Sequence, residues 1–262
     1  MVDLLIHSLI RTLIAAVLIF LPTAGVAMLM QKMAGRFEKI AVQTFGKRGY
    51  MVVFGWLGSA VHELSHALLC VVFRHKVDAV RLFDLNPAAE RVGFVRHRYN
   101  RRSLYQQAGN FFIALAPIFV GAIVVYAAGI LLVPEVLAWP SFKDIPDTRL
   151  AGFLGAVIRS FIALSAWENY GNPAYYLFLY ILFCIGSGMK LSAADLRGAK
   201  TGGVFALACL FGVNLLDLTL LGTAPLLPSI TRAMIGIYNI MLLVLVMHII
   251  LIMPFLLIAR RR

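Results

Sequence analysis

The residues of this chain best suited to chemistry lie in an H-E-x-x-H motif at residues 62–66. Residues four apart lie on one face of a helix, so His62 and His66 can bind one zinc ion, and Glu63 is placed to act as a general base. The same pattern could instead be a structural cluster in which these side chains pair with one another. The motif interrupts an apolar run at residues 50–73, and ionisable groups inside a membrane are costly and tend to be functional. Spacing and location together favour a zinc site.

Composition indicates the class of protein that must position this motif. The chain has 262 residues, of which 61% are hydrophobic and 14% charged. The mean hydropathy of +0.87 is too high for a soluble domain and is typical of a multi-span membrane protein. The net charge of +12 does not indicate a nucleic-acid partner, because the basic residues fall in connecting segments and at residues 259–262, where they fit anionic lipid headgroups. We therefore expect one membrane-embedded domain over residues 1–262.

The apolar runs predict an all-α polytopic membrane protein with about six transmembrane helices. A membrane-spanning helix needs about 20 predominantly apolar residues. Runs of that length occur at Leu9–Met30, Tyr50–Phe73, Gln106–Val133, Ala174–Leu196, Val204–Leu226 and Met234–Ala259.

Basic residues predict the orientation of these spans. Residues 74–105 are rich in arginine and lysine and the chain ends in three arginines, whereas residues 134–173 are nearly balanced in charge. The positive-inside rule then places residues 74–105 and both termini in the cytoplasm of a cell with this protein in its inner (plasma) membrane. The basic connection at residues 31–49 would lie outside. Either the first segment does not cross fully or this connection is an exception to the rule.

The basic segment after the second span has the pattern of a small cytoplasmic β-hairpin. Residues 77–85 and 91–99 are strand-like, and the sequence Asn-Pro-Ala-Ala-Glu at residues 86–90 is a good turn. An irregular basic loop lying on lipid headgroups is the alternative.

A catalytic zinc site takes three protein ligands, and two aspartates compete for the third position. At about 1.5 Å per helical residue, His66 lies ~10 Å from the cytoplasmic end of its helix and Asp217 on the order of 20 Å from its own. Asp195 lies a few residues from the cytoplasmic end of the fourth span. Depth therefore favours Asp195 over Asp217, whose carboxylate would instead bond a neighbouring helix or line a polar cavity.

These features resemble the site-2 protease family of intramembrane zinc metalloproteases over residues 50–198. The resemblance rests on the motif at residues 62–66 in a membrane helix, on Gly109-Asn110 opening the next span, and on an aspartate that ends a later span. It implies a cytosol-proximal active site, a transmembrane protein substrate, Glu63 as catalytic base, and Zn²⁺ bound by His62, His66 and Asp195.

The chain also departs from the family pattern. Ser187 and Lys190 stand where the family has Asn and Pro before the aspartate, and Gly198 follows Asp195 two residues later than the family's glycine. Asn110 could orient a substrate carbonyl or could satisfy backbone groups at the start of the third span.

Other residues fit roles in packing or at the surface. The small residues Gly55, Gly58 and Ser59 would let a neighbouring helix approach the histidines closely. The three cysteines, among them Cys70, lie in apolar runs and fit small packing residues, and the remaining histidines, apart from His248, fit surface positions.

The expected activity is hydrolysis of peptide bonds in membrane-spanning proteins. The alternative from another class is a membrane transporter or assembly subunit that keeps a metal site without hydrolysis, but such a site has no need of a base at Glu63. A zinc protease of the prenyl-protein type would take its third ligand from a glutamate. That type is disfavoured because the remaining glutamates all fall outside the predicted spans, at Glu38, Glu90, Glu135 and Glu168.

Overall fold

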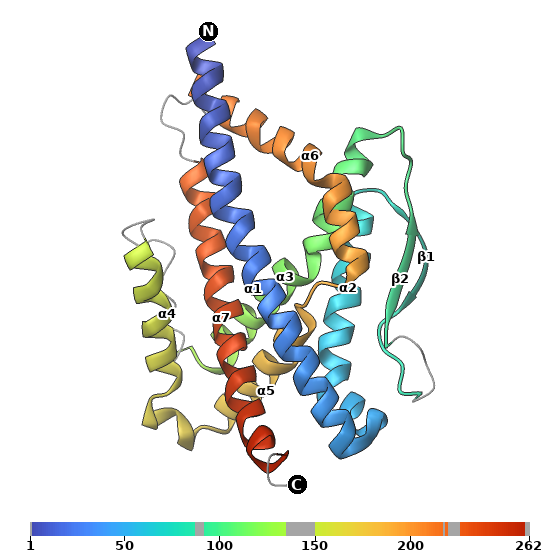
Figure 1. The fold of residues 1–262 in the computed structure, drawn as a ribbon, viewed down its shortest axis with the longest axis vertical. Coiled ribbons are helices and arrows are strands. Elements are labelled where there is room, and N and C mark those ends of the chain that lie inside the picture. Colours follow the sequence, from blue (N-terminus) through green and yellow to red (C-terminus); the bar gives the residue numbers. More distant parts are fainter. Residues whose placement is uncertain (1, 87–91, 135–149, 217, 220–225, 260–262) are drawn as a thin grey trace.

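The computed structural model describes residues 2–86, 92–134, 150–216, 218–219 and 226–259. Within these residues the fold is helical apart from one antiparallel two-stranded sheet (Figure 1). The elements in chain order are α1 (Val2–Tyr50), η1 (Met51–Gly55), α2 (Trp56–Val72), β1 (Lys76–Arg81), β2 (Phe94–Arg98), α3 (Leu104–Leu132), α4 (Leu150–Leu164), η2 (Trp167–Gly171), α5 (Pro173–Gly188), α6 (Ala193–Leu216) and α7 (Leu226–Ala259).

The centre of the molecule is the apolar packing of α3, α5 and α7. Their fully buried side chains include Ile118, Val125, Phe178, Leu182, Met241 and Val244. A Cβ atom at Gly186 would overlap the side chain of Val244, so glycine there lets α5 and α7 approach closely. Small residues at helix contacts are typical of membrane bundles, where close backbone packing replaces the hydrophobic drive.

The first helix is longer than predicted. Residues 31–49, expected to be a connection, instead continue α1 to Tyr50, with one non-helical residue at Gly46, where φ is 71°. The prediction of a connection was wrong because a helix with many charged residues has the same low hydropathy as a polar loop. The hydroxyls of Thr23 and Tyr238 lie 2.9 Å apart and join α1 to α7 through a polar contact.

Within the described residues, fewer helices have the length and hydropathy of a membrane span than the six predicted. In the part of the chain that the structure describes, two helical stretches are long and apolar enough to cross a membrane, Leu104–Leu132 and Gly236–Met253. The bent pair formed by α5 and the first part of α6 makes up to three, because together the two helices reach the required length across a break with a bend of 63°. The helix that carries the histidines, α2, has 17 residues and continues directly from the five-residue π-helix η1.

The beginning of α1 and the end of α7 lie at opposite ends of the molecule. In Figure 1, α1 begins at the top and α7 ends at the bottom, and the two helices run side by side in the same direction. The positive-inside prediction that both termini are cytoplasmic stays a prediction.

The predicted hairpin is present. Strand β1 pairs with β2 in antiparallel register, with Val77 opposite His97 and Val80 opposite Val95. Arg98 donates from Nε and Nη2 to the carboxylate of Asp78 at 2.7 and 2.8 Å, and this pairing lowers the pKa of Asp78. Of the turn predicted at residues 86–90, only Asn86 is among the described residues.

Candidate metal centre

Helix α2 presents both histidines of the motif toward α3 and α5. The Nδ1 atom of His62 lies 2.7 Å from the carbonyl oxygen of Gly188, and Nδ1 of His66 lies 2.8 Å from that of Ile113. A carbonyl oxygen can only accept, so each Nδ1 carries the hydrogen and donates it. In the neutral imidazoles the lone pairs are then on the two Nε2 atoms, which is the tautomer that metal-binding histidines adopt.

Asp195 reaches the histidines because the chain breaks between α5 and α6. Ser192 and Asp195 form a capping box at the start of α6: the Ser192 N–H donates to Oδ2 of Asp195 at 2.7 Å, and the Asp195 N–H donates to Oγ of Ser192 at 3.2 Å. Asp195 was predicted at the end of the fourth span. It lies instead in the first turn of α6, and the cap fixes its carboxylate.

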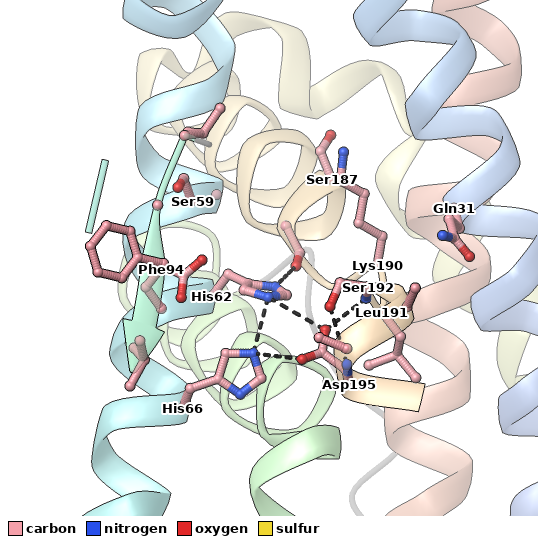
Figure 2. Close-up of a pocket in the computed structure, with 18 of the residues that line it drawn as sticks. Gln31, Ser59, His62, His66, Phe94, Ser187, Lys190, Leu191, Ser192 and Asp195 are labelled. Atoms are coloured by element: carbon pink, nitrogen blue, oxygen red, sulfur yellow. Dashed lines mark hydrogen bonds and ion pairs between the residues drawn. The ribbon is translucent and has the colours of Figure 1, made fainter. Parts of the chain in front are cut away.

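Three acceptor atoms converge at this point, as Figure 2 shows. The Nε2 atoms of His62 and His66 are 3.1 Å apart, and the carboxylate oxygens of Asp195 lie 3.2 Å from Nε2 of His66 and 3.8 Å from Nε2 of His62. Ligands at ~2.0–2.1 Å from a tetrahedral zinc are separated from one another by roughly 3.3 Å. Lone pairs this close repel unless a positive charge, either a shared proton or a metal ion, lies among them. The donor set therefore fits Zn²⁺.

A cavity of about 890 Å³ opens onto these ligands. Glu63, half-buried, and the buried Asn110 both line it. The Nδ2 group of Asn110 donates to the carbonyl oxygen of Gln107 at 3.3 Å, as the backbone-satisfying alternative requires, while the residue also lines the cavity. Of the predicted site residues, the structure thus brings His62, Glu63, His66, Asn110 and Asp195 to one cavity. Asp217 lies outside the described residues.

Sequence reasoning missed two contributors to the cavity wall. A Cβ atom at Gly93 would lie 2.7 Å from Cγ of Glu63, so glycine lets the backbone just before β2 lie against the predicted base. Glu38 was assigned to a connection, but it lies on α1 and lines the cavity. Its Oε2 atom forms an ion pair with Nζ of Lys190 at 2.8 Å. Among the described residues Glu38 is not part of the three-ligand cluster.

The expected close approach at the small residues of α2 is confirmed at Gly58. A Cβ atom at Gly58 would overlap the carbonyl oxygen of Cys184, and one at Gly188 would overlap the carbonyl of Gly58. The two helices therefore meet backbone to backbone. This contact holds the Gly188 carbonyl against His62.

We expect Gly58→Ala to reduce metal binding by at least about tenfold and to destabilise the fold by about 1–3 kcal/mol. The added methyl group must displace α5, which moves the carbonyl that orients His62. Metal content and thermal unfolding of the purified variant measure both effects. Gly212→Ala is the control, because nothing lies within 4 Å of a Cβ atom there and its metal content should match the wild type.

The histidines after α2 are placed differently from the sequence expectation. His75 is buried, with 5% of its surface exposed, whereas a surface position was predicted from its basic surroundings. Cys70 is fully buried, as a packing residue would be, but it lies close to His75 and His97.

No family model, curated protein or solved structure matches the chain.

Proposed function

We propose that this chain is an intramembrane zinc peptidase that hydrolyses peptide bonds of membrane-spanning proteins. The observation that supports the proposal most directly is the convergence of His62, His66 and Asp195 in a cavity that Glu63 also lines. One of the two apolar helices with the length of a membrane span, α3, contributes Asn110, Ile113 and Ala114 to the cavity wall, which supports a site within or at the edge of a bilayer. The site-2 protease family, which the motif resembles, has the same chemistry.

Each residue has a distinct part in the proposed reaction. Zn²⁺ at this site would lower the pKa of water toward ~7 and polarise the scissile carbonyl. Glu63 takes a proton from the attacking water and delivers it to the leaving amine. The carbonyls of Gly188 and Ile113 hold the two imidazoles in the orientation and tautomer that ligation requires.

The hairpin supports a way of holding the substrate. A membrane helix protects its peptide bonds by internal hydrogen bonding, so a substrate must unwind locally before it can be cut. The cavity is lined by residues 92–95 as well as by His62 and Glu63. An extended segment added along β2 would therefore lie beside the proposed base.

The proposal is tested by comparing the membrane proteins of cells that carry the wild type or Glu63→Gln. We expect at least one membrane protein to accumulate uncut in the variant, with the wild type producing new peptide ends inside or next to its apolar segment. If the wild type and Glu63→Gln both hold zinc and the two cells contain the same cut and uncut membrane proteins, the chain is a binding subunit and not a peptidase.

The orientation is tested by labelling single cysteines with a membrane-impermeant thiol reagent. In a background lacking the exposed Cys209, we expect Trp167→Cys to react in intact cells and Arg96→Cys to react only after permeabilisation. The reason is that the basic hairpin segment should stay in the cytoplasm. The opposite labelling pattern would place the metal centre near the outer face.

A further inference from the structure

A second group of metal-binding side chains lies one helical turn beyond the first. Cys70 follows His66 by four residues on α2, about 6 Å along the helix axis. The helix ends just after it: Arg74 adopts a left-handed conformation with φ 56°, its N–H donates to the carbonyl of Val71, and the N–H of His75 donates to the carbonyl of Cys70. This is a Schellman motif, and it turns the chain back so that His75 lies beside Cys70.

Strand pairing adds the third member. His97 on β2 lies opposite Val77 of β1, two residues after His75. One donor atom from each of Cys70, His75 and His97 lies within 4.8 Å of the others, and the two Nδ1 atoms are 3.0 Å apart. Tetrahedral zinc separates two nitrogen ligands by roughly 3.3 Å and a nitrogen and a sulfur ligand by roughly 3.6 Å, so the cluster needs little movement to hold such an ion.

The hydrogen bonds leave one lone pair of His75 directed at this cluster. The Nε2–H of His75 donates to the carbonyl oxygen of Gln106 at 2.8 Å, so its Nδ1 carries the lone pair. A Cβ atom at Gly109 would lie 3.1 Å from this Nε2, and glycine thereby lets α3 approach the ring. Tyr99 stacks on the other side, with ring centroids 5.2 Å apart. The ring is held in one orientation from three directions.

We propose that Cys70, His75 and His97 form a second transition-metal site, distinct from the one at His62, His66 and Asp195, for a thiophilic ion such as Zn²⁺. On binding, the Cys70 thiol loses its proton to solvent, the proton of His97 moves from Nδ1 to Nε2, and both Nδ1 atoms become ligands. Thiolate and imidazole are the donors that Zn²⁺ selects, whereas Mg²⁺ and Ca²⁺ take oxygen ligands.

The site would tie together three elements, of which α2 and β2 line the cavity. Cys70 belongs to the helix that carries the first histidines, His97 to the strand that lines the cavity, and His75 to the turn between α2 and β1. A metal ion here would therefore hold β2 in its position beside the cavity. Its binding energy would add to the stability of the hairpin.

Substitution with Co²⁺ separates the two sites, because only the second contains sulfur. We expect the metal-depleted wild type to bind two equivalents of Co²⁺ and to develop a thiolate-to-cobalt charge-transfer band in the near ultraviolet. His62→Ala should keep this band while losing one equivalent. Cys70→Ser should lose the band and one equivalent, and Cys209→Ser, which removes an exposed thiol, should behave as the wild type.

His97→Gln provides an independent test if Cys70→Ser fails to fold, because His97 is only partly buried. It should weaken Co²⁺ binding at the sulfur-containing site by at least about tenfold and leave the other equivalent in place. A wild type without the charge-transfer band, or a band that persists in Cys70→Ser, would overturn the proposal. Neither result depends on whether the protein cleaves peptides, so the proposed function is tested separately.

Discussion

Glu63→Gln is expected to bind zinc as the wild type does and to lose about 100-fold or more in peptide hydrolysis. Glutamine keeps the size and the hydrogen-bonding capacity of the side chain but cannot accept a proton from water at neutral pH, and general-base catalysis contributes about 10²–10⁴-fold. Because Glu63 is not among the three clustered ligands, metal content should not change. Zinc per chain and turnover of an identified substrate are the two measurements.

Two further variants identify the cause of any loss. His62→Ala should lower metal content together with activity, because it removes a ligand. Glu168→Gln makes the same chemical change on the exposed helix η2, away from the cavity, and should leave turnover unchanged. Turnover of Glu63→Gln equal to that of the wild type would show that another group moves the proton.

The second large effect is expected at Asp195. Asp195→Ala should lose both zinc and activity, because two histidines alone hold zinc poorly. Asp195→Asn is the sharper variant: its amide oxygen can still accept from the Ser192 N–H and keep the start of α6, but a neutral amide oxygen is a much weaker zinc ligand than a carboxylate. Both variants should therefore be purified with little metal.

Ser192→Ala separates the role of Asp195 in the helix cap from its proposed role as a zinc ligand. This variant removes the hydroxyl that accepts from the Asp195 N–H but leaves the carboxylate, so it should retain zinc and lose about 1 kcal/mol of stability. Asp217→Ala completes the set and should retain zinc. If Asp217→Ala is the variant without metal, the third ligand comes from that residue, and the depth argument from the sequence was wrong.

Hydropathy and turn chemistry predicted the parts of the fold with strong local signals. The apolar helix α3 and the β-hairpin could both be predicted from the sequence, because each depends on residues that are close together in the chain. The continuation of α1 through residues 31–45 could not, since a helix with charged positions has the same hydropathy as a polar connection. The break before α6 was signalled by Ser192 and Asp195 as a capping pair, but the apolar residues around them suggested an unbroken span.

The candidate site shows the same division. His62, Glu63 and His66 follow from spacing along one helix, which the sequence displays directly. The nearness of Asp195 depends on the contact between Gly58 and Gly188 and on the bend after α5, neither of which a single sequence specifies. The grouping of Cys70 with His97 depends on strand register. A residue on β2 reaches α2 only once the hairpin has folded back.

The ion pair between Glu38 and Lys190 bears on how water would reach a reaction inside a bilayer. Each side chain keeps 35% of its surface exposed, and both line the cavity that contains the three ligands. Removing a charged group from water costs several kcal/mol per ion before pairing offsets part of it, so inside a bilayer this wall of the cavity would favour contact with water. Every peptide bond cut by hydrolysis consumes one water molecule. For the proposed reaction, the pair would therefore mark the side from which water enters. Replacing both residues with apolar residues of similar size should then lower turnover without changing a ligand.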